Sequence, residues 1–226
     1  MNEVSDSKQG LKIGVFDSGV AGLSIANAIK KALPDYEIIY REDSEHFSYG
    51  SRSPEQILRF VEPIFRNMVD EGCAIIVIAC NTVTTTLLDT LRERLTVPLV
   101  GVEPMFEVAA QATQARKIAV CATPTTYASP LYRELKAQYA KDITVFEVEC
   151  RDWPYMADRD PVDDIKVSKR IEEVLGYGVD VIVLACTHYH WIGEKIRYLS
   201  VQKATVIEPE EETVRRLQEV LVSLAL

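Results

Sequence analysis

Short runs of branched apolar residues alternate along the chain with longer amphipathic segments. The run at 74–79 is apolar on every position and the run at 179–185 on every position but Asp180, which is typical of strands buried on both faces of a sheet. The amphipathic segments have helical spacing, as at 54–71, where Ile57, Val61 and Phe65 share one face. The order of strand and helix therefore predicts an α/β fold with parallel sheets.

Eight runs predict strands, at 12–16, 36–41, 74–79, 98–101, 117–121, 143–148, 179–185 and 204–207. Eight segments predict helices, namely one from the turn at 17–22 to about Leu33, then 54–71, 82–95, 103–113, 124–139, 163–177, 190–200 and 210–224. Two longer polar stretches, 42–53 and 150–160, are predicted as loops, and the first has the mixed polarity of a substrate-facing loop.

The two halves of the chain repeat one another. The segment 76–82 (IVIACNT) aligns with 182–188 (IVLACTH), and 12–18 (KIGVFDS) aligns with 117–123 (KIAVCAT), at offsets of 106 and 105 residues. Buried parallel strands resemble each other generally, so the polar residues beside them carry the signal. The repeat predicts two similar Rossmann-like parallel-sheet domains related by a pseudo-two-fold axis, at 1–101 and 102–226, with the last helix, 208–226, able to pack back on the first.

Each half places a cysteine directly after its central strand, Cys80 in the first and Cys186 in the second. Ligands of such sheets bind beyond the carboxyl ends of the strands. If the halves face one another, the two thiols oppose each other across a cleft. A reaction that needs this arrangement is inversion at a carbon with an acidic hydrogen, in which one thiol removes a proton and the other returns one.

Polar residues at the same strand ends can assist the thiols. Asp17 ends the strand beside that of Cys80, and His188 lies two residues after Cys186. Neutral side chains that can hold a small acid by hydrogen bonds, two of them at helix starts, are Ser18, Asn81, Thr82, Thr123 and Thr187.

Composition narrows the class of protein. The net charge of −9 leaves no basic surplus for a nucleic-acid backbone. No apolar run approaches the roughly 20 residues that span a bilayer, and the first ten residues lack a signal-peptide core. Five cysteines within an otherwise ordinary chain favour a reducing compartment. We therefore expect a cytoplasmic protein without membrane or nucleic-acid partners.

These motifs together resemble those of the cofactor-independent glutamate racemases, in the aspartate/glutamate racemase superfamily, over nearly the whole chain. The matching segments are 17–22 (DSGVAG), 47–53 (FSYGSRS), 79–82 (ACNT) and 186–189 (CTHY). The resemblance implies interconversion of L- and D-glutamate for peptidoglycan, no cofactor, a homodimer, and an active site between the domains.

The resemblance also implies a role for individual residues. Cys80 and Cys186 would be the two acid–base groups, assisted by Asp17 and His188 respectively. Residues that would hold the amino acid are Ser18, Tyr49, Gly50, Asn81, Thr82, Thr123, Thr126, Asp158 and Thr187. The chain departs from the family pattern at Ala21, Ser48 and the loop from Cys150 to Asp158.

Other functions fit parts of the same pattern. A racemase of another small acid, such as aspartate, would differ only in how it meets the substrate side chain, and a catalytically reduced paralogue would bind an amino acid without turning it over. Cys186, His188 and His190 could be read as metal ligands, but the spacing is not that of a standard zinc motif. We therefore predict no metal site.

Overall fold

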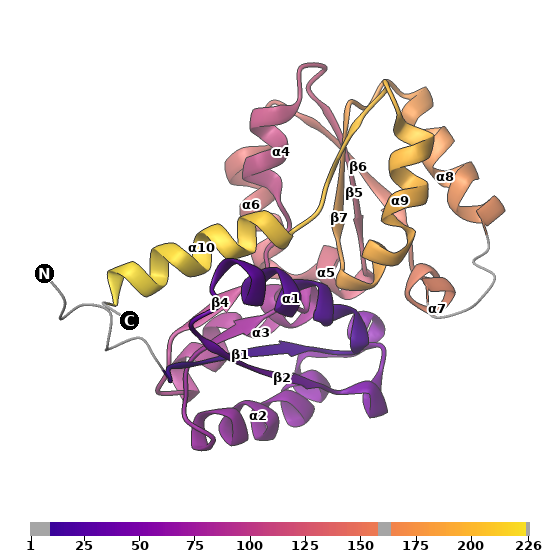
Figure 1. Cartoon of the computed structure of the whole chain (residues 1–226). Helices are drawn as coiled ribbons and strands as arrows, with labels where there is room; N and C mark the ends of the chain where they lie inside the picture. The colour runs from indigo at the N-terminus through magenta and orange to yellow at the C-terminus, as the bar shows by residue number, and fades with distance from the viewer. Residues whose placement is uncertain (1–9, 158–163, 225–226) are drawn as a thin grey trace, which may run out of the picture. The chain divides into compact units, whose positions relative to one another are not determined.

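The computed structural model describes residues 10–157 and 164–224. The chain divides into two compact units, Met1–Val102 with Glu210–Leu226, and Glu103–Pro209. Each unit contains a four-stranded parallel sheet, in the order β2-β1-β3-β4 in the first and β6-β5-β7-β8 in the second (Figure 1). The two orders are the same when each unit is counted from its own first strand, so the predicted pair of similar α/β domains is confirmed.

The strands of the two sheets are β1 (Lys12–Asp17), β2 (Glu37–Glu42), β3 (Cys73–Ile78), β4 (Leu99–Gly101), β5 (Lys117–Ala122), β6 (Thr144–Glu149), β7 (Val181–Ala185) and β8 (Thr205–Ile207). The α-helices are α1 (Leu23–Ala32), α2 (Pro54–Asp70), α3 (Asn81–Arg94), α4 (Phe106–Ala112), α5 (Pro124–Ala128), α6 (Pro130–Tyr139), α7 (Trp153–Ala157), α8 (Asp164–Gly176), α9 (His190–Ser200) and α10 (Glu210–Ser223). Four short 3-10 helices are η1 (Val20–Gly22), η2 (Ser44–His46), η3 (Tyr49–Ser51) and η4 (Thr187–Tyr189).

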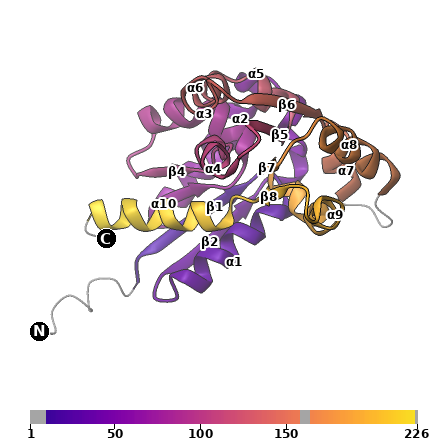
Figure 2. The same cartoon turned by 90° about the horizontal axis from the view of Figure 1, so that it is seen from above.

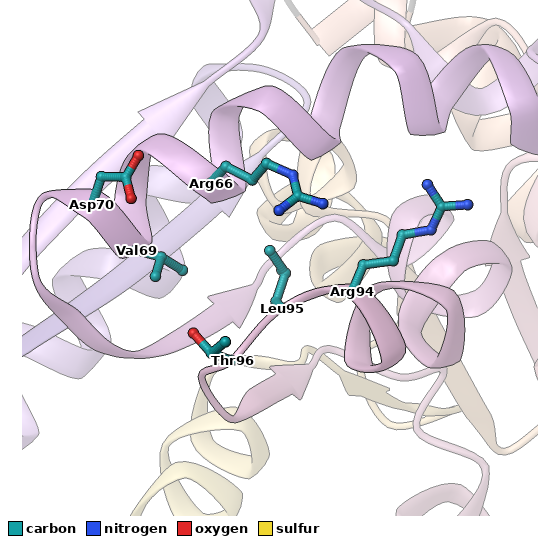
Figure 3. Close-up of a pocket in the computed structure, with 6 residues that line it drawn as sticks. All are labelled: Arg66, Val69, Asp70, Arg94, Leu95 and Thr96. Atoms are coloured by element: carbon teal, nitrogen blue, oxygen red, sulfur yellow. The ribbon is translucent and has the colours of Figure 1, made fainter.

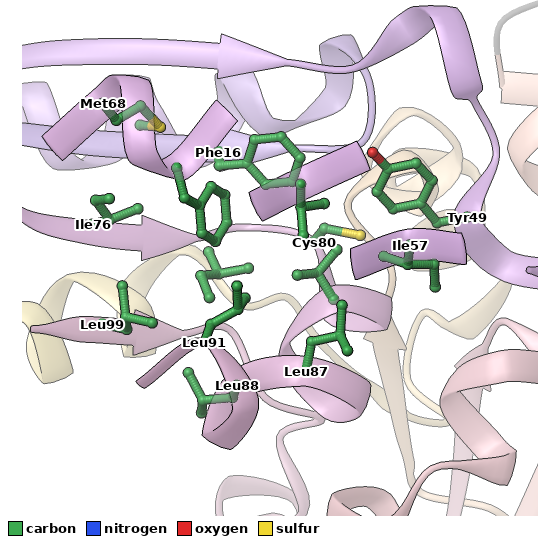
Figure 4. Packing of buried hydrophobic residues seen from close by; sticks show 14 of the residues in the cluster. Phe16, Tyr49, Ile57, Met68, Ile76, Cys80, Leu87, Leu88, Leu91 and Leu99 are labelled. Carbon is green, nitrogen blue, oxygen red and sulfur yellow. The ribbon is translucent and has the colours of Figure 1, made fainter. Parts of the chain in front are cut away.

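The first sheet buries both faces, as its continuous apolar strands predict. Ile13, Val15 and Val77 point to one face, where they pack with residues of α1 and α10. Phe16 and Ile78 point to the other, where α2 and α3 cover them (Figure 4). The helix α10 returns to this unit and contacts α1 and β4 (Figures 1 and 2).

The second sheet has the same two-sided burial. Cys121 and Leu184 face a cluster formed with residues of α8 and α9, while α4 lies against β7 and β8. Within the described residues, none of the helices combines the length and apolarity required to cross a bilayer.

The lysine that begins each aligned strand makes the same contact in the two units. Lys12 at the start of β1 donates from Nζ to the carbonyl of Glu71 at 3.0 Å, and Lys117 at the start of β5 donates to that of Tyr177 at 2.9 Å. Each carbonyl precedes a glycine in the left-handed region, Gly72 at φ 87° and Gly178 at φ 78°, which ends the preceding helix. The repeated halves therefore share turn chemistry as well as topology.

Two expectations for the second unit are wrong in detail. The single helix at 124–139 is two helices, because Ser129 precedes Pro130 and takes an extended conformation that caps α6 through its side chain. The loop at 150–160 contains α7, with Trp153 fully buried against Tyr189 at a ring-centroid distance of 5.3 Å. A buried aromatic anchor thus orders a segment whose sequence is mainly polar.

Candidate active site

Cys80 follows the carboxyl end of β3 and is the N-cap residue of α3. The side chain is 5% exposed, and its thiol donates a hydrogen bond to Ser18 Oγ at 3.3 Å. Ser18 directly follows Asp17, the last residue of β1. Because β1 and β3 are paired in parallel up to Phe16 and Ile78, the residues that follow the two strands lie close together. The first unit therefore brings Asp17, Ser18 and Cys80 together at one edge of its sheet, as predicted from the sequence.

The surroundings of Cys80 favour the thiol over the thiolate. Burial and the negative charge of Asp17 raise the pKa of Cys80 to about 11, and the Ser18 hydrogen bond with the backbone N–H groups of Val83 and Thr82 offsets part of this. A helix N-terminus normally lowers a cysteine pKa. At Cys80, desolvation and a neighbouring carboxylate outweigh that effect, so the thiol stays protonated at neutral pH and can donate its proton.

Asp17 is fully buried and its carboxylate is held in place by the turn that follows β1. The backbone N–H of Gly22 donates to Asp17 Oδ2 at 2.9 Å. A Cβ atom on Gly22 would lie 2.3 Å from Asp17 Cβ, closer than any non-bonded pair allows. Only glycine fits at this position, because the chain turns directly over the carboxylate.

We expect Gly22→Ala to lower the free energy of unfolding by about 1–3 kcal/mol, since the added methyl group overpacks the Asp17 turn. The same change at Gly176, where a Cβ meets no atom within 4 Å, is the matched control. Gly176 ends α8, and alanine there is expected to be neutral or stabilising. Urea unfolding of both variants measures the difference, and equal midpoints would contradict the packing argument.

Asn81 begins α3 directly after Cys80 and is 2% exposed. Among the described residues, neither its Oδ1 nor its Nδ2 atom has a hydrogen-bond partner. Buried amides are nearly always paired, so these two amide atoms are available to hydrogen-bond a polar ligand beside the thiol. The next residue, Thr82, is also buried.

The loop after β2 places Tyr49 and Gly50, the two residues predicted there to hold substrate, at the same end of the first sheet. Both are buried, and Tyr49 packs in the cluster that contains Cys80 (Figure 4). The Tyr49 hydroxyl donates to the carboxylate of Asp43, which is itself only 7% exposed. The sequence reasoning missed Asp43, although an acidic residue that follows β2 beside the Asp17 strand was a usable signal.

In the second unit, Cys186 follows β7 and is half-buried. Thr187, His188 and Tyr189 form η4, and the backbone N–H of Tyr189 donates to the Cys186 carbonyl at 3.0 Å. Thr187 Oγ1 lies 3.4 Å from His188 Nδ1. The short 3-10 turn therefore holds the predicted Cys186, Thr187 and His188 at the end of one strand.

Burial lowers the pKa of His188 to about 4, so its imidazole is neutral at pH 7. The His188 imidazole of the folded state resists protonation down to that pH, whereas that of the unfolded chain binds a proton near the ordinary histidine pKa of 6.5. The contribution of His188 to the free energy of unfolding is therefore fully present above pH 6.5 and is lost as the pH drops toward 4.

We expect His188→Gln to remove about 3 kcal/mol of pH dependence between pH 6.5 and 4, because glutamine does not titrate. The measurement is the unfolding free energy of both proteins at several pH values. The wild-type curve should fall relative to the variant curve on acidification. Parallel curves would mean that His188 is not desolvated.

Thr123 and Thr126 lie at the end of β5, the strand beside β7. Thr123 is the N-cap of α5 and accepts from the Thr126 backbone N–H at 3.2 Å, and the two hydroxyl oxygens are 3.0 Å apart. By the offset of 105 residues, these positions repeat those of Ser18 and Ala21 in the first unit. Asp158, also predicted to hold substrate, lies outside the described residues.

His190 belongs to a different group of side chains. Its Nδ1 atom lies 3.2 Å from Glu208 Oε1, and Arg197 pairs with the same carboxylate. The other cysteines, Cys73, Cys121 and Cys150, are buried, and desolvation raises the pKa of Cys73 and Cys150. These three thiols have the character of small apolar core residues.

A surface pocket of about 260 Å³ in the first unit lies away from Cys80. It is lined by Arg66, Val69, Asp70, Arg94, Leu95 and Thr96 (Figure 3). These residues end α2 and α3, so the pocket is at the amino ends of β3 and β4, opposite the cysteine. Arg66 and Arg94 both pair with Glu62, which balances much of their charge.

Comparisons with known proteins identify the family of this chain. The sequence model of the Asp/Glu/Hydantoin racemase family matches residues 13–217. A glutamate racemase of Bifidobacterium adolescentis is 33% identical over 219 residues, covering 94% of this chain and 85% of that protein.

Two solved structures are similar over most of the chain. One is a glutamate racemase isoform of Bacillus anthracis, with a TM-score of 0.83, 29% identity and coverage of 96% of this chain and 83% of that one. The other is Escherichia coli glutamate racemase with L-glutamate and the activator UDP-MurNAc-ala, with a TM-score of 0.83, 28% identity and coverage of 93% and 82%. The resemblance noted in the sequence is confirmed, and the chain belongs to the Asp/Glu/hydantoin racemase family.

Proposed function

We propose that the protein interconverts L- and D-glutamate without a cofactor, with Cys80 and Cys186 as its two acid–base groups. The observation that carries this proposal is the equivalent placement of a thiol at the end of the central strand in each repeated unit. The glutamate racemases among the relatives support glutamate as the substrate.

In the proposed reaction, the thiolate on one side removes the α-hydrogen of the bound amino acid as a proton. The electron pair delocalises into the α-carboxylate, and the thiol on the other side donates its proton to the opposite face of the carbon. One thiol is protonated and the other deprotonated, so solvent exchange must reset the pair before the next turnover. No electron is gained or lost overall.

Cys80 is suited to the donating role in its resting state. With a pKa of about 11, its deprotonation at pH 7 costs roughly 5 kcal/mol. For Cys80 to act as the base, a neighbouring group must take its proton. We assign that task to the Asp17 carboxylate, which is buried and influences the Cys80 pKa directly.

For Cys186 we assign the partner role to the neutral imidazole of His188, in place of a carboxylate. Because His188 is not protonated at pH 7, it can accept the thiol proton when Cys186 acts as the base. The two thiols therefore have partners of different chemistry, although the units that carry them are alike in topology.

The substrate is held in this proposal by neutral donors and acceptors around the thiols. The unsatisfied Asn81 amide receives the polar groups of the amino acid from the first unit. The remaining binding residues we assign are Ser18, Tyr49, Gly50, Thr82, Thr123, Thr126, Asp158 and Thr187.

The test is chiral chromatography of L- and D-glutamate after incubation with the purified protein, repeated with both enantiomers of aspartate. We expect each glutamate enantiomer to approach an equal mixture, with aspartate at least tenfold slower. Faster turnover of aspartate would mean that aspartate and not glutamate is the substrate. Binding without turnover would indicate a catalytically reduced paralogue.

The biological setting belongs to the same proposal. D-glutamate made in the cytoplasm would supply peptidoglycan synthesis, and we infer a homodimer as the working assembly. Sedimentation at micromolar concentration tests the assembly, with a single species of one-chain mass as the contrary result.

A further inference from the structure

We propose that Asp43, together with His46, is a positioning residue for substrate binding, which holds Tyr49 and Gly50 against the Cys80 end of the first sheet. The proposal rests on the proposed function, since it concerns how the same site holds its amino acid.

Asp43 lies at the centre of a partly buried hydrogen-bond network in the loop after β2. Its carboxylate accepts from the Tyr49 hydroxyl and from His46 Nδ1, which lies 2.8 Å from Oδ1 and 3.0 Å from Oδ2. A carboxylate that is 7% exposed is costly unless donors satisfy it. Two side chains from the same loop supply those donors and fix the loop in one conformation.

His46 is also held in place by contacts with α2. Its ring stacks on Phe60 of α2 at a centroid distance of 3.8 Å and an interplanar angle of 14°. Arg52 lies over the same Phe60 ring at 5.3 Å and donates from Nε to the His46 carbonyl at 3.0 Å. The loop is therefore clamped between α2 and the Asp43 carboxylate.

This network connects directly with the residues assigned to the reaction. The backbone N–H of Asp43 donates to the Asp17 carbonyl at 3.3 Å. On the other side, η3, which starts with Tyr49, contacts α3, the helix that Cys80 caps. Figure 4 shows the Tyr49 ring beside the Cys80 side chain. A shift of Tyr49 would thus move the substrate-facing backbone of Gly50 relative to the thiol.

Burial, and then the hydrogen bond to Asp43, raise the pKa of Tyr49 above its ordinary value. The phenol therefore stays protonated beside Cys80 and keeps donating to Asp43. Because the network contacts the loop and not the reacting carbon, its loss should weaken binding of the ground state and the transition state alike. We expect a higher KM with kcat little changed.

The experiment measures the Kd of D-glutamate by calorimetry, together with kcat and KM, for six variants. Asp43→Asn and Tyr49→Phe should each raise Kd and KM about tenfold, as expected for loss of a hydrogen bond to a charged group. The double variant should be no more than about twofold worse than either single one, because the two residues form one interaction.

A matched pair at His46 separates hydrogen bonding from packing. His46→Asn keeps a donor near the Nδ1 position and loses the ring, so Kd should stay within about twofold. His46→Phe keeps a ring to stack on Phe60 and loses the donor, so Kd should rise at least threefold. The control is Glu45→Gln, which removes an exposed charge from the same turn and should leave all three constants unchanged.

Each outcome bears on the proposal. Multiplicative effects of Asp43→Asn and Tyr49→Phe, an unchanged Kd in Asp43→Asn, or a larger loss in His46→Asn than in His46→Phe would overturn it. Wild-type protein that binds glutamate but does not racemise it would overturn the proposed function alone, since Kd still reports on the loop. Wild-type protein that does not bind glutamate would overturn both.

Discussion

Replacement of Cys80 or Cys186 by serine is expected to reduce racemisation of glutamate at least 1,000-fold, within the range that a positioned acid–base group contributes. A serine hydroxyl is a far weaker acid than a thiol and supplies no competent base at neutral pH. Either loss is sufficient, because each direction of the reaction uses one thiol to remove the proton and the other to return it. Chiral chromatography of both enantiomers measures the loss.

The matched control is Cys73→Ala, because Cys73 is a buried thiol at the opposite end of β3 from Cys80. It should retain wild-type turnover.

The two serine variants should also differ from one another in deuterium oxide. Each retains one thiol, so each should exchange the α-hydrogen of a single enantiomer without racemisation, and the two variants should select opposite enantiomers. Wild-type racemisation in either serine variant would defeat the mechanism.

Asp17→Asn is expected to have two effects, which act on the rate of racemisation in opposite directions. Removal of the carboxylate lowers the pKa of Cys80, since the charge of Asp17 raises that pKa after burial does. If charge alone mattered, a more accessible thiolate would speed the reaction. Because we assign Asp17 the task of accepting the Cys80 proton, we expect kcat/KM to fall about 100-fold instead.

The equilibrium constant between L- and D-glutamate fixes how the loss of kcat/KM is shared between the two directions of the reaction. The two enantiomers are equal in free energy in water, so kcat/KM must fall by the same factor from both sides. The pH dependence of Cys80 alkylation, followed by mass spectrometry of the Cys80 peptide, gives the thiol pKa of each protein. A lower pKa with faster racemisation would assign Asp17 a purely electrostatic role. An unchanged pKa would show that Asp17 does not act on Cys80.

The sequence predicted the sheets better than the segments that join them. The runs at 74–79 and 181–185 predict strands because they have no polar side chain to present to solvent, and the sequence alone reveals this. The break at Ser129 required recognition of a capping residue before Pro130. The helix at Trp153 depends on burial against Tyr189, a contact that no local pattern encodes.

The site residues that lie at strand ends could be predicted from the sequence. The residue that matters through its side-chain contacts was missed. Cys80, Asp17 and Ser18 converge because parallel strands finish at one edge, which alternation alone implies. Asp43 was missed because its importance comes from hydrogen bonds to His46 and Tyr49, which the spacing of residues does not reveal. Its proximity to the Asp17 strand was the only sequence signal.

The most direct test of the two-thiol account is the position of deuterium after brief turnover of L-glutamate in deuterium oxide. If one thiol removes the proton and the other supplies its replacement, the first D-glutamate formed should carry deuterium at the α-carbon while the remaining L-glutamate carries almost none. Deuterium at equal levels in both enantiomers from the start would mean that a single group serves both faces of the carbon, and would contradict the account.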